Sequence, residues 1–202
     1  AYIGAEPLVA ALDQGAHVVI GGRIADPSLV LGGLSHAFRW APDDWERLGA
    51  GIAIGHLLEC GPQVTGGYFG DPGMKEIGDL SRIGAPIAEC WADGTATITK
   101  LPNTGGVVTT ATCTEQLLYE LHDPAHYITP DCVLDITDLD LTQAGADRVR
   151  VTGARARPRT DTYKVTVGYD DGFIGEGQIS YAGAHALDRA RWAAEEIGRA
   201  HV

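Results

Sequence analysis

The carboxyl group of Glu59 stands where a predicted helix ends, in the stretch Glu59-Cys60-Gly61-Pro62. The helix dipole disfavours negative charge at that end, so an acid placed there often has a partner or a task. A carboxyl group shielded from water can act as a general acid or base. We therefore expect Glu59 to be catalytic, and the alternative is a surface glutamate at a frayed helix end.

Two Thr-Gly-Gly triplets, at 65–67 and 104–106, could bring backbone N–H groups close to an anionic ligand, because glycine has no Cβ. Lys100 would add a full positive charge, and the following helix would point its positive end at the same ligand. Against this, Thr112-Cys113-Thr114-Glu115 has the capping-box pattern, in which a helix caps itself. We expect Lys100 to be catalytic, and we expect substrate binding by Thr65, Gly66, Gly67, Thr104, Gly105 and Gly106.

Arg23 and Asp26 follow the apolar stretch 17–20, which has the composition of a short buried strand. In open α/β sheets, ligands bind at the carboxyl ends of such strands. We expect Arg23 to bind the substrate, and the alternative is that it pairs with Asp26 across the turn. Asp26 itself precedes Pro27 and is expected to cap the next helix.

The sequence lacks GxGxxG, GxxxxGK[ST], GxSxG and HExxH, which removes support for dinucleotide, P-loop, serine-hydrolase and zincin chemistry. His122 and His126 have the i, i+4 spacing of a helical metal site, but Pro124 between them would break the helix. We therefore expect no metal site, and the cofactor is unknown.

Capping signals and hydrophobic periodicity predict a mixed α/β and α+β chain. A parallel α/β layer is expected in the first half, with a helix at 6–14, a strand at 17–20 and helices at 26–38 and 42–61. Residues 61–84 have no strong period and are expected to form a long loop. The second half is expected to be a mostly antiparallel sheet with covering helices: strands at 87–91, 95–100, 132–142, 148–154, 162–169 and 173–181, and helices at 114–121 and 184–199.

These elements divide the chain at about residue 84. Residues 1–84 would be the C-terminal part of an α/β domain truncated at its N-terminus, and 85–202 an α+β region, unless the two form one continuous domain. The expected truncation rests on the first residue, which is Ala rather than Met, and on the helix that begins almost at once.

Composition excludes several classes of function. The 202 residues carry a formal net charge of −12, and the only basic cluster, at 155–159, is interrupted by Ala and Pro, so no nucleic-acid partner is expected. There is neither a stretch long enough to span a membrane nor a signal peptide, which predicts a cytoplasmic protein with no membrane partner. The four cysteines are too widely spaced for a CxxC motif and are expected to be reduced.

Four segments in order resemble the acyclic terpene utilisation family of AtuA-type proteins: GGRIADPSLVLGGL (21–34), HLLECGPQVTGGYF (56–69), ITKLPNTGGVVTTATCTEQLLYELHDPAHYITPD (98–131) and KVTVGYDDGFIGEGQISYAG (164–183). The resemblance covers essentially the whole chain. Members of that family are considerably longer, with an additional N-terminal Gly- and Asn-rich α/β portion, in agreement with the expected truncation. They are encoded beside acyl-CoA carboxylases and other enzymes of citronellol and geraniol breakdown.

The resemblance implies a role in bacterial catabolism of acyclic terpenoids or branched acyl-CoA intermediates. It brings no agreed set of catalytic residues, so the sites above rest on their chemistry. Our leading hypothesis is a hydratase, lyase or isomerase acting on an anionic acyl thioester, as a monomer or a homo-oligomer. The alternative is a non-catalytic binding or assembly subunit for a partner acyl-CoA carboxylase or a small companion protein, and a third is a nucleotide-dependent enzyme with a nonstandard loop.

Overall fold

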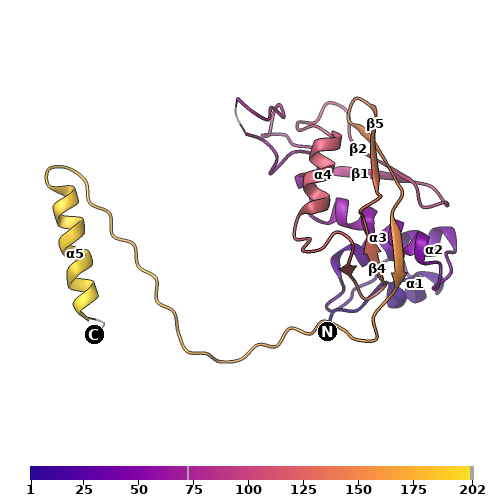
Figure 1. The fold of residues 1–202 in the computed structure, drawn as a ribbon, viewed down its shortest axis with the longest axis horizontal. Helices are drawn as coiled ribbons and strands as arrows, with labels where there is room; N and C mark the ends of the chain where they lie inside the picture. The colour runs from indigo at the N-terminus through magenta and orange to yellow at the C-terminus, as the bar shows by residue number, and fades with distance from the viewer. Residues whose placement is uncertain (72, 201–202) are drawn as a thin grey trace. The chain divides into compact units, whose positions relative to one another are not determined.

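A computed structural model describes residues 1–71 and 73–200, with side chains described as far as residue 198 (Figure 1). The chain forms two compact units, Ala1–Thr166 and Val167–Val202. The larger unit holds four of the five α-helices and both sheets of the described residues. In the part of the chain described, no helix is both long and apolar enough to cross a membrane.

Three helices of the first half begin and end close to the predicted bounds. They are α1 (Glu6–Asp13), α2 (Asp26–Phe38) and α3 (Trp45–Glu59), followed by the short 3₁₀ helix η1 (Gly61–Gln63). Asp44 caps α3 by accepting a hydrogen bond from the backbone N–H of Arg47. Asp26 is the first residue of α2 rather than its cap, since Ala25 has the extended backbone of the cap position.

Two antiparallel sheets confirm the mixed α and β composition. The first sheet has the strand order β1-β2-β6-β5, formed by Pro86–Cys90, Ala96–Lys100, Arg148–Thr152 and Asp140–Gly145. The second has the order β3-β4-β7, formed by Tyr127–Ile128, Cys132–Asp135 and Arg155–Pro158. The predicted hairpin around Asp93-Gly94 is confirmed as β1–β2, with Gly94 at a φ of 88° in its turn.

The predicted strand at 17–20 is absent from the described structure, and with it the parallel layer of the first half. The side chains of Val18 and Ile20 are 77% and 92% exposed, because no neighbouring described segment offers an edge to pair with. The parallel contact that does form here is a single bridge between Ile3 and Ile24, on either side of α1. An apolar run predicts burial, but the burial itself needs a partner strand.

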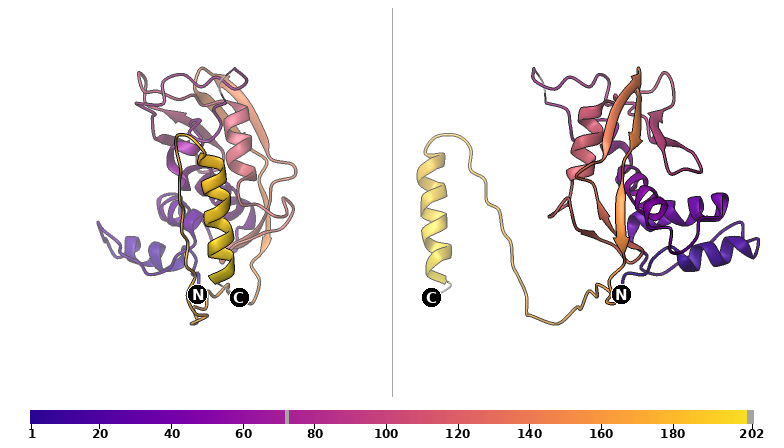
Figure 2. Two further views of the ribbon diagram at one scale, coloured as in Figure 1. Left: turned by 90° about the vertical axis from the view of Figure 1, so that its left-hand side faces the viewer. Right: turned by 45° about the vertical axis from the view of Figure 1, so that its right-hand side comes forward.

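The core is built around α3. One side of the helix packs Ile52 and Ala53 against α2 and β4, and its end packs Leu57 between β2, β6 and α4 (Thr110–Leu118). Figure 2 shows α4 beside the strands of the first sheet, where Cys113 and Leu117 bury their side chains. The carboxyl end of α3 is therefore held on several sides, which fixes the position of Glu59.

Two predicted strands and one predicted helix have different bounds. The strand at 132–142 is interrupted because the Asp135 carboxylate accepts hydrogen bonds from the N–H and hydroxyl of Thr137, which turns the chain between β4 and β5. The strand at 148–154 ends at Gly153, whose φ of 79° starts β7 in the other sheet. The helix predicted at 114–121 begins four residues earlier, at Thr110, because Thr109 is its true cap.

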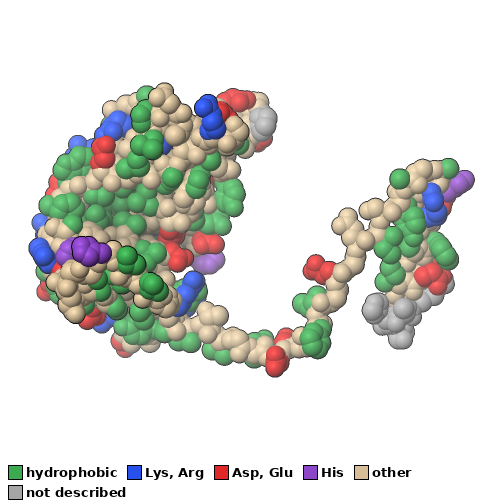
Figure 3. All heavy atoms as spheres, turned by 180° about the vertical axis from the view of Figure 1, so that it is seen from behind, with side chains coloured by type: hydrophobic (Ala, Val, Ile, Leu, Met, Phe, Trp, Pro, Cys, Tyr) green, Lys and Arg blue, Asp and Glu red, His purple; other side chains and the backbone are tan. Residues whose placement is uncertain are grey.

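The smaller unit consists of an extended segment and α5 (Ala186–Ala200). The helix confirms the prediction for 184–199, but the predicted strands 162–169 and 173–181 form no ladder in the described chain. The guanidinium group of Arg189 donates to the carbonyl oxygens of Ala182 and Ala184 and so fixes the turn before α5. Apolar side chains stay exposed along this unit, among them Phe173, Ile174, Leu187 and Trp192 (Figure 3).

Candidate functional site

A cavity of about 900 Å³ in the larger unit is lined by Arg23 and Glu59, two of the residues singled out from the sequence. Arg23 lies in the turn before α2, and Glu59 is the last residue of α3. The cavity therefore joins the ends of two helices that are neighbours in the fold. Arg23 and Lys164 lie near Tyr2, Glu59 lies near Tyr127, and the charge of Asp26 acts on both Arg23 and Tyr127.

The basic part of the lining is formed by three segments that backbone hydrogen bonds tie together. The Ile3 N–H donates to the Arg23 carbonyl over 3.1 Å, and the Tyr2 N–H donates to the Lys164 carbonyl over 2.9 Å. Arg23 donates to the Tyr2 hydroxyl over 2.7 Å, and its Cζ lies 4.1 Å from the centre of the Tyr2 ring. The Lys164 Nζ lies 5.2 Å from the same ring, so two cations flank one tyrosine.

This arrangement changes the acidity of Tyr2. The pKa of its hydroxyl is lowered, chiefly by the hydrogen bond from Arg23 and then by one from Thr166. Arg23 and Lys164, the two cations beside Tyr2, would also attract another oxyanion. The basic part of the cavity is thus suited to a carboxylate or a phosphate.

The acidic part begins at the carboxyl end of α3. Residues three apart lie on one face of a helix, so His56 and Glu59 meet there, with His56 Nδ1 2.7 Å from Glu59 Oε1. Their side chains are only 2% and 12% exposed. The Tyr127 ring packs over the imidazole, with the two ring centres 5.2 Å apart. Glu59 and Tyr127 line the cavity, with His56 behind them.

Polar atoms without a protein partner cluster at this end of the helix. Four buried side-chain nitrogen or oxygen atoms in the described residues lack a hydrogen bond, and three of them are His56 Nε2, Glu59 Oε2 and Gln116 Oε1. Gln116 belongs to α4, and its Nε2 donates to the His56 carbonyl over 2.8 Å. Buried polar atoms are nearly always paired, so three unpaired atoms at one helix end distinguish this region from the rest of the described core.

Tyr127 can serve as a hydrogen-bond donor in the cavity. Burial raises the pKa of its hydroxyl, and the negative charges of Glu59 and then Asp26 and Glu120 raise it further. The phenol therefore keeps its proton at neutral pH. Carboxylates surround it, so the acidic part of the cavity repels anions while the basic part attracts them.

Lys100 and the two triplets lie elsewhere and do not line this cavity. The Lys100 Nζ lies 3.1 Å from Asp147 Oδ2 and donates to the Thr104 carbonyl over 2.9 Å, with its side chain 5% exposed. The triplets do meet, since the Val107 N–H donates to the Thr65 carbonyl over 2.9 Å. A Cβ on Gly106 would come within 2.4 Å of that carbonyl oxygen, so the glycine permits close backbone packing here.

The capping box predicted for Thr112 to Glu115 is wrong, because the box lies one turn earlier. Thr109 accepts a hydrogen bond from the Thr112 N–H, and the Thr112 hydroxyl oxygen accepts one from the Thr109 N–H. Glu115 instead pairs with Lys75 of the long loop over 3.3 Å. The helix therefore caps itself just after the second triplet.

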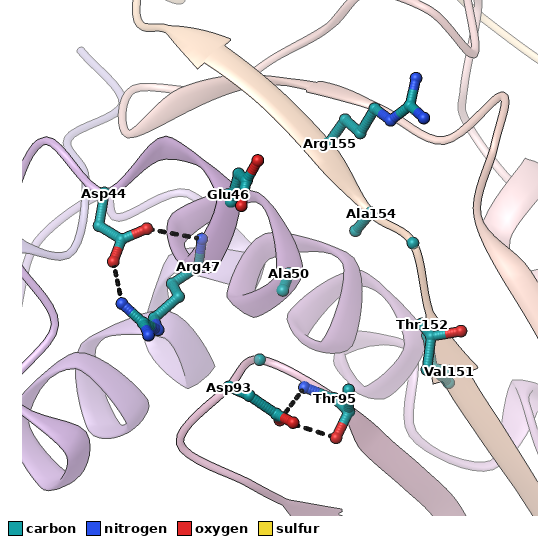
Figure 4. Close-up of a pocket in the computed structure, with 12 residues that line it drawn as sticks. Asp44, Glu46, Arg47, Ala50, Asp93, Thr95, Val151, Thr152, Ala154 and Arg155 are labelled. Carbon is teal, nitrogen blue, oxygen red and sulfur yellow. Dashed lines mark hydrogen bonds and ion pairs between the residues drawn. The ribbon is translucent and has the colours of Figure 1, made fainter.

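A second cavity, of about 380 Å³, lies between α3, the β1–β2 turn and the junction of β6 with β7 (Figure 4). Several of its polar groups are already paired with one another. Asp44 binds the guanidinium of Arg47, and Asp93 accepts from the N–H and hydroxyl of Thr95 over 2.9 and 2.8 Å. This arrangement holds the turn and leaves the Arg23–Glu59 cavity as the better candidate.

Residues 1–201 match the family model described as acyclic terpene utilisation family protein AtuA. The chain belongs to this AtuA family. No curated protein and no solved structure matches the chain significantly.

The sequence did not single out four AtuA residues that build this site: Tyr2, His56, Tyr127 and Lys164. The three-residue spacing of His56 and Glu59 on a predicted helix was the one sequence signal that could have placed His56 in the site. Tyr2 and Lys164 are 162 positions apart in the sequence, and only the folded backbone brings them together.

Proposed function

We propose that this AtuA-family chain binds an anionic, branched acyl thioester formed during the breakdown of acyclic terpenoids such as citronellol and geraniol. Arg23 and Lys164 would hold the carboxylate or phosphate, and Glu59 would move a proton. The reaction would be of the hydratase, lyase or isomerase class. The observation that carries this proposal is that Arg23 and Glu59 line one cavity.

The distribution of charge would fix the orientation of the substrate. An anionic group is attracted by Arg23 and Lys164 and repelled by the carboxylates at the other part of the cavity. The uncharged acyl part of the ligand would then extend towards Glu59 and Tyr127. Binding energy at the anion would in this way position the reacting carbon.

The groups near the acyl part suit proton transfer next to a thioester. A thioester carbonyl acidifies the C–H bonds on the carbon beside it and, through a conjugated C=C bond, those at the γ position, and a positioned carboxylate can remove such a proton. The Tyr127 phenol, whose pKa is raised by burial and by Glu59, could donate a hydrogen bond to the carbonyl oxygen as negative charge develops there.

Calorimetric titration with 3-methylbut-2-enoyl-CoA tests the binding step. Arg23→Ala should weaken binding about 10- to 100-fold, since a hydrogen bond to a charged group contributes roughly 1.5–3 kcal/mol. Arg39→Ala is the matched control, because Arg39 is an exposed arginine paired with Asp13, away from the cavity. Unchanged affinity in Arg23→Ala, or no binding by the wild type, would contradict the proposal.

The exposed apolar side chains of the smaller unit favour a second candidate function, that of an assembly subunit. Phe173 and Ile174 are fully or almost fully exposed, and α5 carries Leu187 and Ile197 on one side. Exposed apolar groups of this size often mark protein contacts. The alternative predicts a stable complex with a partner acyl-CoA carboxylase in co-purification, with no turnover by this chain alone.

A further inference from the structure

Two of the unpaired atoms behind the cavity wall belong to one buried pair of side chains, His56 and Glu59. Glu59 has one carboxyl oxygen in contact with His56 and its other oxygen, Oε2, without a partner. His56 likewise has Nδ1 paired and Nε2 unpaired. Glu59 Oε2 has almost no solvent-accessible surface, so a group in the cavity would reach this unpaired acceptor only as the side chains that cover it move aside.

A purely structural role explains this pair poorly. A histidine–acid pair away from the cavity is more exposed: in His36–Asp13 the side chains are 31% and 43% exposed. The His56 and Glu59 side chains are 2% and 12% exposed, and burying a charge or a polar group is costly unless its hydrogen bonds are complete. Three neighbouring unpaired atoms leave these bonds incomplete.

We infer that His56 is the positioning residue of a His56–Glu59 dyad, in which imidazole Nδ1–H donates to Glu59 Oε1 and leaves Oε2 as the proton acceptor. This inference rests on the proposed function. In the proton-transfer step, a C–H bond of a methyl group at C3, which is conjugated with the thioester carbonyl through the C2=C3 bond, breaks and an O–H bond forms at Glu59 Oε2. The electron pair stays on the substrate and is delocalised onto the carbonyl oxygen. His56 keeps its own proton throughout.

The surroundings of His56 hold it in place beside Glu59. Gln116 Nε2 donates to the His56 backbone carbonyl and holds this turn of α3, while the Tyr127 ring covers the imidazole. The backbone of His56 is thus held by Gln116 and its ring by Tyr127 and Glu59. A second hydrogen bond that fixes the base is the usual way in which proteins orient a catalytic group.

Deuterium exchange into 3-methylbut-2-enoyl-CoA in D₂O, followed by NMR, tests the dyad in the full chain. His56→Leu removes the donor and should slow exchange about 100-fold, with the affinity for this thioester unchanged. His56→Asn places an amide N–H near Nδ1 and should restore exchange to within about tenfold of the wild type. His36→Leu is the matched control, because His36 forms an exposed pair with Asp13 at 2.6 Å.

Imidazole ¹⁵N NMR of the wild type and of Glu59→Gln separates this inference from the proposed function. The dyad predicts that His56 carries its proton on Nδ1 and that its Nδ1 signal shifts in Glu59→Gln. If the wild type shows no exchange but these signals appear, the proposed function fails and the dyad stands. A proton on Nε2, or an Nδ1 signal unaffected by Glu59→Gln, overturns the dyad, as does full exchange by folded His56→Leu. If thermal melting shows that His56→Leu is unfolded, the NMR result decides.

Discussion

His56 Nδ1 lies 2.7 Å from Glu59 Oε1, and this contact links the buried interior of α3 to the wall of the Arg23–Glu59 cavity. The pair lies at the end of a helix that is packed on several sides. Glu59 therefore has a fixed position, and its free oxygen Oε2 is the atom on which the proposed chemistry depends.

Substitution by alanine should have opposite effects on stability at two helical glycines, Gly55 and Gly33. A Cβ at Gly55 would lie 2.3 Å from the Pro27 carbonyl oxygen, so Gly55→Ala should push α3 away from α2 and cost about 1–3 kcal/mol. Gly33, in α2, faces open space, so Gly33→Ala should stabilise the fold by up to about 1 kcal/mol. Urea unfolding of both variants checks this, and equal effects would contradict the close approach of α3 to α2.

Removing the charge of Asp147 should destabilise the fold more than removing that of its partner, Lys100. Asp147→Asn keeps the side-chain oxygen that accepts from the Val108 N–H but leaves the ammonium of Lys100 buried without its counter-charge, which should cost about 3 kcal/mol. Lys100→Met leaves a carboxylate that is 34% exposed and should cost less, about 1 kcal/mol. Urea unfolding measures both costs.

The same Lys100 variant tests whether this residue is catalytic, as the sequence predicts. Because Lys100 lies outside the Arg23–Glu59 cavity, we expect Lys100→Met to keep its affinity for 3-methylbut-2-enoyl-CoA and its rate of deuterium exchange. A large loss of exchange in a folded Lys100→Met protein would place Lys100 in the catalytic site after all.

The four thiols should fall into two classes. Burial raises the pKa of Cys113 and of Cys132 to about 12, so neither forms the reactive thiolate at pH 8. Cys60 and Cys90 are only partly buried, and burial raises the pKa of each to a smaller extent. A chromogenic disulfide reagent should titrate two thiols slowly in the native chain and all four in urea. Rapid reaction of four native thiols would contradict the burial of α4 and β4.

Acid should destabilise the larger unit through exposed carboxylates. Hydrogen bonds from Arg148, His36 and Ser81 lower the pKa values of Glu89, Asp13 and Asp79 respectively. Each folded pKa lies below the unfolded one, so the stabilisation is complete above the unfolded value and is lost as pH falls through the folded value. Urea midpoints should therefore fall below about pH 4.5, the ordinary range of Glu and Asp. Glu89→Gln should flatten this dependence, and a wild-type midpoint that is constant from pH 7 to pH 3 would contradict it.

Local signals were sufficient for much of the fold. Pro7, Asp44 and the Asp93-Gly94 turn predict where α1, α3 and the β1–β2 hairpin begin or turn, because caps and turns depend on neighbouring residues. The predictions failed where the formation of a strand depends on pairing with another segment of the chain. The stretches 17–20 and 173–181 have strand-like composition, but no described segment pairs with them.

The candidate site was predictable only in part. A predicted helix end drew attention to Glu59, and a predicted strand at 17–20, which does not form, drew attention to Arg23. Both residues line one cavity, but nothing in the sequence placed Lys164 beside Tyr2. That contact depends on a backbone hydrogen bond across 162 positions. The grouping of unpaired atoms at His56, Glu59 and Gln116 likewise exists only in the folded chain.

Comparison of Glu59→Gln with the wild type tests the central claim most directly. The amide is the same size as the carboxyl group, so binding of 3-methylbut-2-enoyl-CoA, measured by calorimetry, should change little. Deuterium exchange into the bound thioester should fall by at least about 100-fold, because the amide cannot accept the proton. Wild-type exchange in a folded Glu59→Gln protein would contradict the assignment of Glu59 as the proton carrier.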